Sequence, residues 1–104
     1  VRRAFVDLGL TDTDLVRTPD GSDAVIGRYQ GPQGAPRVLL YAHYDVQPAP
    51  PEGWVSDPWT LTERDGRYYG RGAADCKGSI VTHLTALRAL LATGELPVSL
   101  TVVI

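Results

Sequence analysis

The sequence predicts an α/β fold, built on a partial, mixed and largely parallel sheet with flanking helices. Three segments between Arg37 and Ile104 indicate this class. Arg37–His43 (RVLLYAH) and Val98–Ile104 (VSLTVVI) are apolar runs typical of strands. Ser79–Thr93 lies between them with the apolar periodicity of a helix. A strand, a helix and a second strand in this order favour parallel strands joined by a crossover helix.

The N-terminal third predicts one helix and two short strands. Arg2–Leu8 is expected to be helical because Gly9 follows it, where a left-handed cap belongs. Pro19-Asp20-Gly21 has the composition of a turn. These signals predict a weak strand at Leu15–Arg17, a second strand at Ala24–Tyr29 and a loop at Gln30–Pro36.

Prolines and glycines divide the middle of the chain. Val38–Tyr41 is continuously apolar, which indicates a strand covered on both faces. Gln47–Gly53 holds three prolines and is expected to be irregular. Farther along, Arg64-Asp65-Gly66 predicts a hairpin turn between two short strands, Trp59–Glu63 and Arg67–Tyr69.

The segment Gly70–Gly78 (GRGAADCKG) has three glycines in nine residues, which predicts an unusual backbone path. The helix that follows places its apolar residues on one face, with Gly94 as a cap. We expect that face to be buried; it comprises Ile80, Leu84, Leu87 and Leu91.

Composition excludes several classes of partner. With 104 residues the chain has room for one small domain, and its net charge of -2 is scattered along the sequence. The lack of a basic run argues against nucleic acid and against an anionic membrane surface. No apolar run approaches the roughly 20 residues that cross a bilayer. The single cysteine cannot form an internal disulfide, so a cytoplasmic location is expected.

His43 and Asp45 form an H-x-D pair just past a predicted strand end, which is where chemistry gathers in parallel sheets. Imidazole is a common ligand of zinc and similar ions. A metal-bound histidine usually donates its other ring N–H to a carboxylate, and Asp45 is suitably near. Considered alone, the pair is also compatible with a structural histidine and a turn-capping aspartate.

Asp75 lies in the glycine-rich segment just before the helix. It is compatible with a helix N-cap, which is a common role of aspartate, or with a carboxylate that bridges two metal ions. Lys77, the only lysine, could balance local negative charge, hold the loop or simply be solvated.

Three blocks together carry a resemblance to a known family. Tyr41–Pro48 (YAHYDVQP) resembles the first metal motif of the M20 metallopeptidases, and Gly53–Trp59 (GWVSDPW) and Glu63–Gly78 (ERDGRYYGRGAADCKG) match in order and spacing. The motif HYDVQP is most similar to that of the dipeptidase branch, which includes carnosinase-like enzymes. Because the chain has no methionine and stops in an apolar run, we expect residues 1–104 to be the N-terminal part of a single metallohydrolase catalytic domain, incomplete at both ends.

The resemblance implies a function and roles. It implies a zinc-peptidase-like domain that hydrolyses an amide bond with two divalent metal ions, normally zinc, with manganese or cobalt as alternatives. His43 would bind one ion, Asp75 would bridge both, and Asp45 would hold and polarise His43. The general base and the other metal ligands would follow Ile104, and a homodimer would form through a domain outside this chain. The resemblance also implies a cis peptide bond between Asp75 and Cys76.

The substrate stays open between small peptides and N-acyl amino acids. Dipeptide hydrolysis is the first interpretation, and an N-acyl-amino-acid deacylase or desuccinylase of the same family is the second. A non-catalytic metal-binding or interaction domain is the alternative from another class. Four other residues are interpreted as structural, either in a helix or in packing: His83, Trp54, Trp59 and Cys76.

Overall fold

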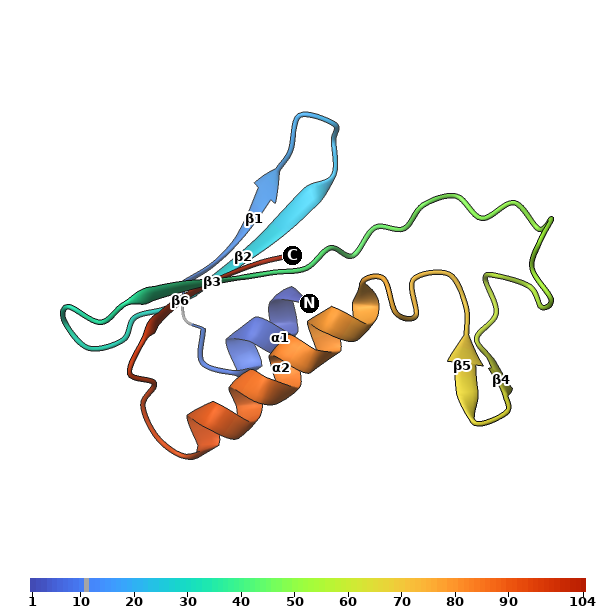
Figure 1. The fold of residues 1–104 in the computed structure, drawn as a ribbon. Helices are drawn as coiled ribbons and strands as arrows, with labels where there is room; N and C mark the ends of the chain where they lie inside the picture. The colour runs from blue at the N-terminus through green and yellow to red at the C-terminus, as the bar shows by residue number, and fades with distance from the viewer. Residues whose placement is uncertain (11) are drawn as a thin grey trace.

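The computed structural model describes residues 1–10 and 12–104. A four-stranded sheet forms one layer, and α1 and α2 lie together against one of its faces (Figure 1). None of the described helices combines the length and hydropathy that a membrane span requires. The elements are, in order, α1 (Arg2–Asp7), β1 (Asp12–Arg17), β2 (Asp23–Tyr29), β3 (Arg37–Tyr41), β4 (Thr62–Arg64), β5 (Arg67–Tyr69), α2 (Lys77–Ala92) and β6 (Ser99–Val103).

The strand order is β1-β2-β6-β3, and the sheet is mixed as predicted. The expectation that it is largely parallel is wrong for the described strands, because only β3 and β6 run parallel. The short turn between β1 and β2 forces those two strands to be antiparallel. Only the connection from β3 to β6 is long enough, and contains the helix needed, for a parallel crossover.

The β1–β2 hairpin is longer than its apolar residues predict. β1 begins at Asp12 because Arg28 of β2 forms ion pairs with Asp12 and Asp14, at 3.0 and 2.9 Å. At the tip, Asp20 accepts hydrogen bonds from Thr18 and Ser22. Because these contacts are polar, hydrophobic patterning alone predicts a strand that is too short.

The core lies between the sheet and the two helices. Phe5 of α1 packs over Gly27 of β2, where an added Cβ would lie 2.8 Å from the phenyl ring. The predicted helix face is confirmed, since Ile80 and Leu87 are buried and Leu84 and Leu91 pack against the core. The buried core cluster consists of Phe5, Leu10, Leu87, Leu96, Leu100 and Val102.

β3 differs from its predicted environment. Leu39 is 64% exposed and Tyr41 is 65% exposed, so the strand is not covered on both faces. β3 is at the edge of the sheet, and the helices cover only the other face, toward which Leu40 packs.

A long irregular connection leads from β3 to a separate hairpin, β4–β5, which projects away from the main sheet (Figure 1). Its predicted turn is confirmed, since Asp65 and Gly66 adopt positive φ angles of 52° and 68°. Two successive left-handed residues are the signature of the type I′ turn that suits hairpin twist. α2 begins two residues before its predicted start, at Lys77.

Candidate metal centre

His43 lies just beyond the C-terminal end of β3. The preceding residue, Ala42, is buried and donates a backbone hydrogen bond to the Val103 carbonyl, so strand pairing continues to the residue before the imidazole. The neighbouring strand therefore fixes the backbone that carries this side chain.

Asp45 holds one side of the His43 ring. Nδ1 lies 3.0 Å from the Asp45 backbone carbonyl and 3.3 Å from its carboxylate Oδ1. The expected proximity of the two residues is confirmed, although the nearer acceptor is the backbone. The Asp45 side chain is 84% exposed. An Nδ1–H that donates to Asp45 leaves Nε2 free to serve as a ligand.

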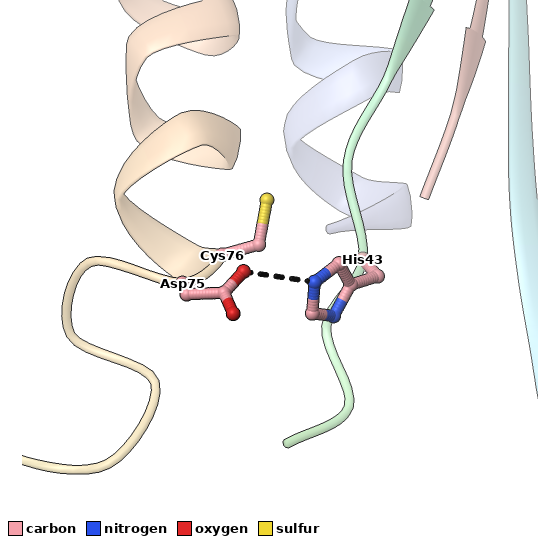
Figure 2. A group of neighbouring side chains, drawn as sticks. All are labelled: His43, Asp75 and Cys76. Carbon is pink, nitrogen blue, oxygen red and sulfur yellow. Dashed lines mark hydrogen bonds and ion pairs between the residues drawn. The ribbon is translucent and has the colours of Figure 1, made fainter. Parts of the chain in front are cut away.

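Asp75 approaches the opposite side of the ring (Figure 2). Its Oδ1 lies 3.1 Å from His43 Nε2, although the carboxylate side chain is 87% exposed. Asp75 does not cap α2, since Cys76 occupies the N-cap position and no side-chain capping bond forms. The expected cis peptide bond between Asp75 and Cys76 is present.

Contacts on both ring nitrogens favour the protonated imidazole. The hydrogen bond to the Asp45 carbonyl raises the pKa of His43 above its ordinary value, and Asp75 adds to the rise, while partial burial opposes it. A neutral ring donates from only one nitrogen, so both contacts are hydrogen bonds at once only when the ring is charged.

Cys76 completes the cluster. One ligand atom from each of His43, Asp75 and Cys76 lies within 4.8 Å of the others, which places a histidine closer to this thiol than the sequence indicated. Hydrogen bonds from the Ser79 hydroxyl and the His43 backbone N–H lower the pKa of the thiol. In Figure 2 the sulfur lies to one side of the contact between His43 and Asp75.

The donor set fits a divalent transition-metal ion. Zinc ligands lie about 2.0–2.2 Å from the ion, so two ligand atoms on one tetrahedral ion are about 3.3–3.6 Å apart. The 3.1 Å between His43 Nε2 and Asp75 Oδ1 is only slightly shorter than that separation. Imidazole nitrogen and carboxylate oxygen also suit zinc, manganese and cobalt.

A cavity of about 480 Å³ adjoins His43. The tip of the β1–β2 hairpin, the segment from Tyr41 to Asp45 and the end of β6 line it. Small-molecule sites commonly have volumes of roughly 300–1,000 Å³, so a compound of dipeptide size is compatible with this space.

The remaining candidates have structural contacts. His83 is half-buried, as expected, and its Nε2 lies 3.2 Å from the Tyr41 carbonyl, which joins α2 to the end of β3. Arg71 lies over the Trp54 ring at 5.4 Å, whereas Trp59 is largely exposed. Lys77 lies over the Tyr44 ring at 5.1 Å and is half-buried rather than fully solvated. Sequence reasoning missed Tyr44 and Arg71, because no local signal pairs a cation with a distant aromatic ring.

Comparison with known proteins places the chain among peptidases. Residues 39–104 match the model of peptidase family M20/M25/M40. A cysteinylglycine-S-conjugate dipeptidase of Corynebacterium striatum is 50% identical over 100 residues, covering 93% of this chain and 21% of that protein. A succinyl-diaminopimelate desuccinylase of Stenotrophomonas maltophilia is 47% identical over 75 residues, covering 66% of this chain and 20% of that protein.

The fold agrees with this match. The crystal structure of human carnosine dipeptidase 1 superposes with a TM-score of 0.76 and 30% identity, covering 98% of this chain and 24% of that one. The chain belongs to the M20 peptidase family, and it resembles the dipeptidase and carnosinase-like members. It spans about a fifth of the length of the curated relatives it matches.

Proposed function

We propose that residues 1–104 form the N-terminal part of a single catalytic domain that hydrolyses the amide bond of dipeptides or related small peptides with divalent metal ions. The observation that carries the proposal is the 3.1 Å approach of His43 Nε2 to Asp75 Oδ1 at a strand end, beside a cavity. Similarity to a cysteinylglycine-conjugate dipeptidase and to carnosine dipeptidase 1 supports dipeptides as the substrate class.

Each residue of the site has a separate role in the proposal. His43 and Asp75 would hold the metal ions, with Asp75 a ligand of both, and Asp45 orients the His43 ring through Nδ1. Zinc is the preferred ion, with manganese or cobalt as alternatives. When bound, such ions would supply Lewis-acid polarisation of the scissile carbonyl and activation of water.

The end of β3 and the N-terminal end of α2 keep the two ligands together. The Asp45 carbonyl fixes the His43 ring orientation, and the irregular segment before α2 brings the Asp75 carboxylate to the ring. The cavity that His43 and Asp45 line would hold a small peptide with its amide bond near the His43 ring.

Removal of an N-acyl group is the second candidate reaction. The desuccinylase of Stenotrophomonas maltophilia is nearly as similar to this chain, over fewer residues, as the dipeptidase is. Both reactions cleave an amide bond, so they place the same demand on His43 and Asp75 and differ in the substrate pocket.

The test uses the intact protein, freed of metal with a chelator and then supplied with zinc, manganese or cobalt. Cys-Gly, β-Ala-His and N-succinyl amino acids serve as substrates. We expect metal-dependent cleavage of dipeptides above that of N-succinyl compounds. His43→Ala and Asp75→Asn should each abolish turnover and weaken metal binding, because each removes a donor atom.

Asp65→Asn is the matched control, because it changes an exposed aspartate in the β4–β5 turn, and asparagine tolerates its positive φ. Its turnover should equal that of the wild type. Preference for N-succinyl substrates would favour the second reaction. Metal binding without any turnover would favour a non-catalytic metal-binding domain.

A further inference from the structure

The two ligand-bearing segments meet through side chains, including the hydrogen bond from the His43 backbone N–H to the Cys76 thiol, rather than through backbone pairing. His43 and Asp75 lie in irregular stretches, 43–46 and 70–76, and no backbone–backbone hydrogen bond joins these stretches in the described part of the chain. The Asp75 side chain is mostly exposed, so packing does not fix it. A ligand nitrogen must be unprotonated, so metal binding by both residues would end the hydrogen bond between them. Contacts that do not use the two ligand side chains must then keep the segments in register.

Lys77 makes such a contact. It is the first residue of α2, two positions after Asp75, and its backbone N–H donates to the Gly72 carbonyl at 3.3 Å. Its side chain reaches toward the other segment, where Nζ lies 5.1 Å from the centre of the Tyr44 ring. Tyr44 is the residue between His43 and Asp45, so one side chain connects the neighbours of both ligands.

Gly72 makes room for this connection. It is buried, with a positive φ of 81°, and a Cβ added there would lie 2.6 Å from Val46 Cγ1 and 2.9 Å from Lys77 Nζ. Lys77 and Val46 therefore occupy the space that a side chain at residue 72 would need. The 70–76 segment is held from both sides, by the helix that carries Lys77 and by the stretch that carries Val46.

Lys77 supplies a charge that no other lysine in the chain can replace. A cation within about 6 Å of an aromatic centroid is attracted to the face of the ring. Asp45 and Asp75 flank this contact with exposed carboxylates, yet none of the ion pairs among the described residues includes Lys77. Its ammonium group is directed to the ring of Tyr44 rather than to a carboxylate.

We propose that Lys77 is a positioning residue that, through the face of Tyr44, keeps the Asp75 segment in register with the His43 segment and so sets the separation of the two metal ligands. The inference rests on the proposed function, because it concerns the same metal site. It adds that affinity for the metal depends on a lysine and an aromatic ring that donate no ligand atom.

The experiment compares Lys77→Met, Tyr44→Leu, Tyr44→Phe and the Lys77→Met/Tyr44→Leu double variant of the intact protein. Methionine keeps most of the side-chain length without the charge, and phenylalanine keeps the ring without the hydroxyl. Zinc affinity is measured by competition with a chelating dye, and ligand geometry by the visible absorption of the cobalt-loaded protein. Unfolding of the metal-free proteins reports on the fold separately.

We expect Lys77→Met and Tyr44→Leu each to weaken zinc binding about 2- to 5-fold, as for a cation–aromatic contact at an exposed ring, and to alter the cobalt spectrum. The double variant should bind zinc as well as the single variant with the lower affinity does, because both substitutions remove the same contact. Tyr44→Phe should match the wild type in zinc affinity and in the cobalt spectrum. Tyr44 is 60% exposed, so its two variants should fold even where Lys77→Met does not.

Two failures are distinguishable. If the wild type binds no divalent ion, the proposed function fails and the inference is overturned with it. If the wild type binds zinc but the effects of the two single variants are additive, or Tyr44→Leu binds as tightly as Tyr44→Phe, only the positioning role is overturned.

Discussion

At the scale of single residues, the His43 ring lies between two acceptors that differ in kind. The Asp45 backbone carbonyl is the larger cause of its raised pKa, and the Asp75 carboxylate is a smaller one. Backbone and side chain thus share the orientation of one ring. A side-chain substitution can remove only part of this environment.

We predict that His43 in the metal-free intact protein titrates above the value of about 6.5 for free histidine. Asp45→Asn should leave most of this shift, since the carbonyl remains, and Asp75→Asn should reduce it. Because folding raises the pKa, protonated His43 stabilises the metal-free fold below pH 6.5, and this contribution disappears as pH rises through the folded-state pKa. NMR titration of the ring measures it, and a midpoint below 6.5 would contradict the prediction.

The same shift predicts the pH dependence of metal binding. A proton competes with metal for Nε2, and the raised pKa of His43 makes it compete at higher pH than in free histidine. Zinc affinity measured by calorimetry should therefore begin to fall above pH 6.5 as the solution is acidified. An affinity that stays constant down to pH 5.5 would remove His43 from the ligand set.

Asp45→Ala should lower kcat/KM more than it lowers stability. Outer partners of metal-bound histidines typically contribute about 10- to 100-fold in metal affinity or activity. We expect a loss near the lower figure, about 10-fold, because the nearer acceptor is a backbone carbonyl that survives the change. The side chain is exposed, so the melting temperature should stay within a degree or two of the wild type. Unchanged turnover would exclude the Asp45 carboxylate from the mechanism.

Sequence reasoning located His43, Asp45 and Asp75 because motif spacing is local. It could not locate the contact between Lys77 and Tyr44, which depends on the backbone path through Gly72 and on how α2 approaches β3. The metal roles of His43 and Asp75 stay predictions.

At the scale of elements, hydrophobic period identified α2 and β6 well, because both pack on the core. It predicted too short a β1, because the pairing of this strand with β2 is reinforced by the ion pairs of Arg28. It also placed β3 in the wrong environment, because an aliphatic run does not tell an edge strand from a central one.

The packing of α1 on β2 gives a sharp test at this scale. Gly27→Ala should destabilise the intact protein by about 1–3 kcal/mol, a typical cost of overpacking, because its Cβ would lie 2.8 Å from Phe5. Gly70→Ala is the control, since its Cβ would have ordinary contacts of 3.6 Å or more. Urea unfolding measures both, and equal stability of the two variants would show that α1 does not pack as described.

At the scale of the whole molecule, the described residues contain one three-residue group able to hold a metal, His43 with Asp75 and Cys76. A catalytic zinc ion typically has three protein ligands and one open position, so two ions need more donors than His43 and Asp75 supply. The fold class followed from element order, whereas the mixture of strand directions depended on turn length and on which strand β6 joins.

We therefore predict that the 104 residues expressed alone have no peptidase activity with zinc or manganese. The intact protein, assayed beside them on the same dipeptides, should turn over. Circular dichroism of the shorter chain shows whether it folds, and so separates missing ligands from a missing fold. Turnover by the 104 residues at a rate near that of the intact protein would mean that these residues hold a complete site.

β6 pairs with β2 on one side and with β3 on the other, yet it follows both of them in the chain. A ribosome adds about 5–20 residues per second, so β2 and β3 emerge seconds before the strand that joins them. Until Ser99–Val103 leave the exit tunnel, both strands present unpaired backbone that other chains can engage. The interval of synthesis between Tyr41 and Ser99 is therefore a period in which the nascent chain exposes strand edges that a chaperone would protect.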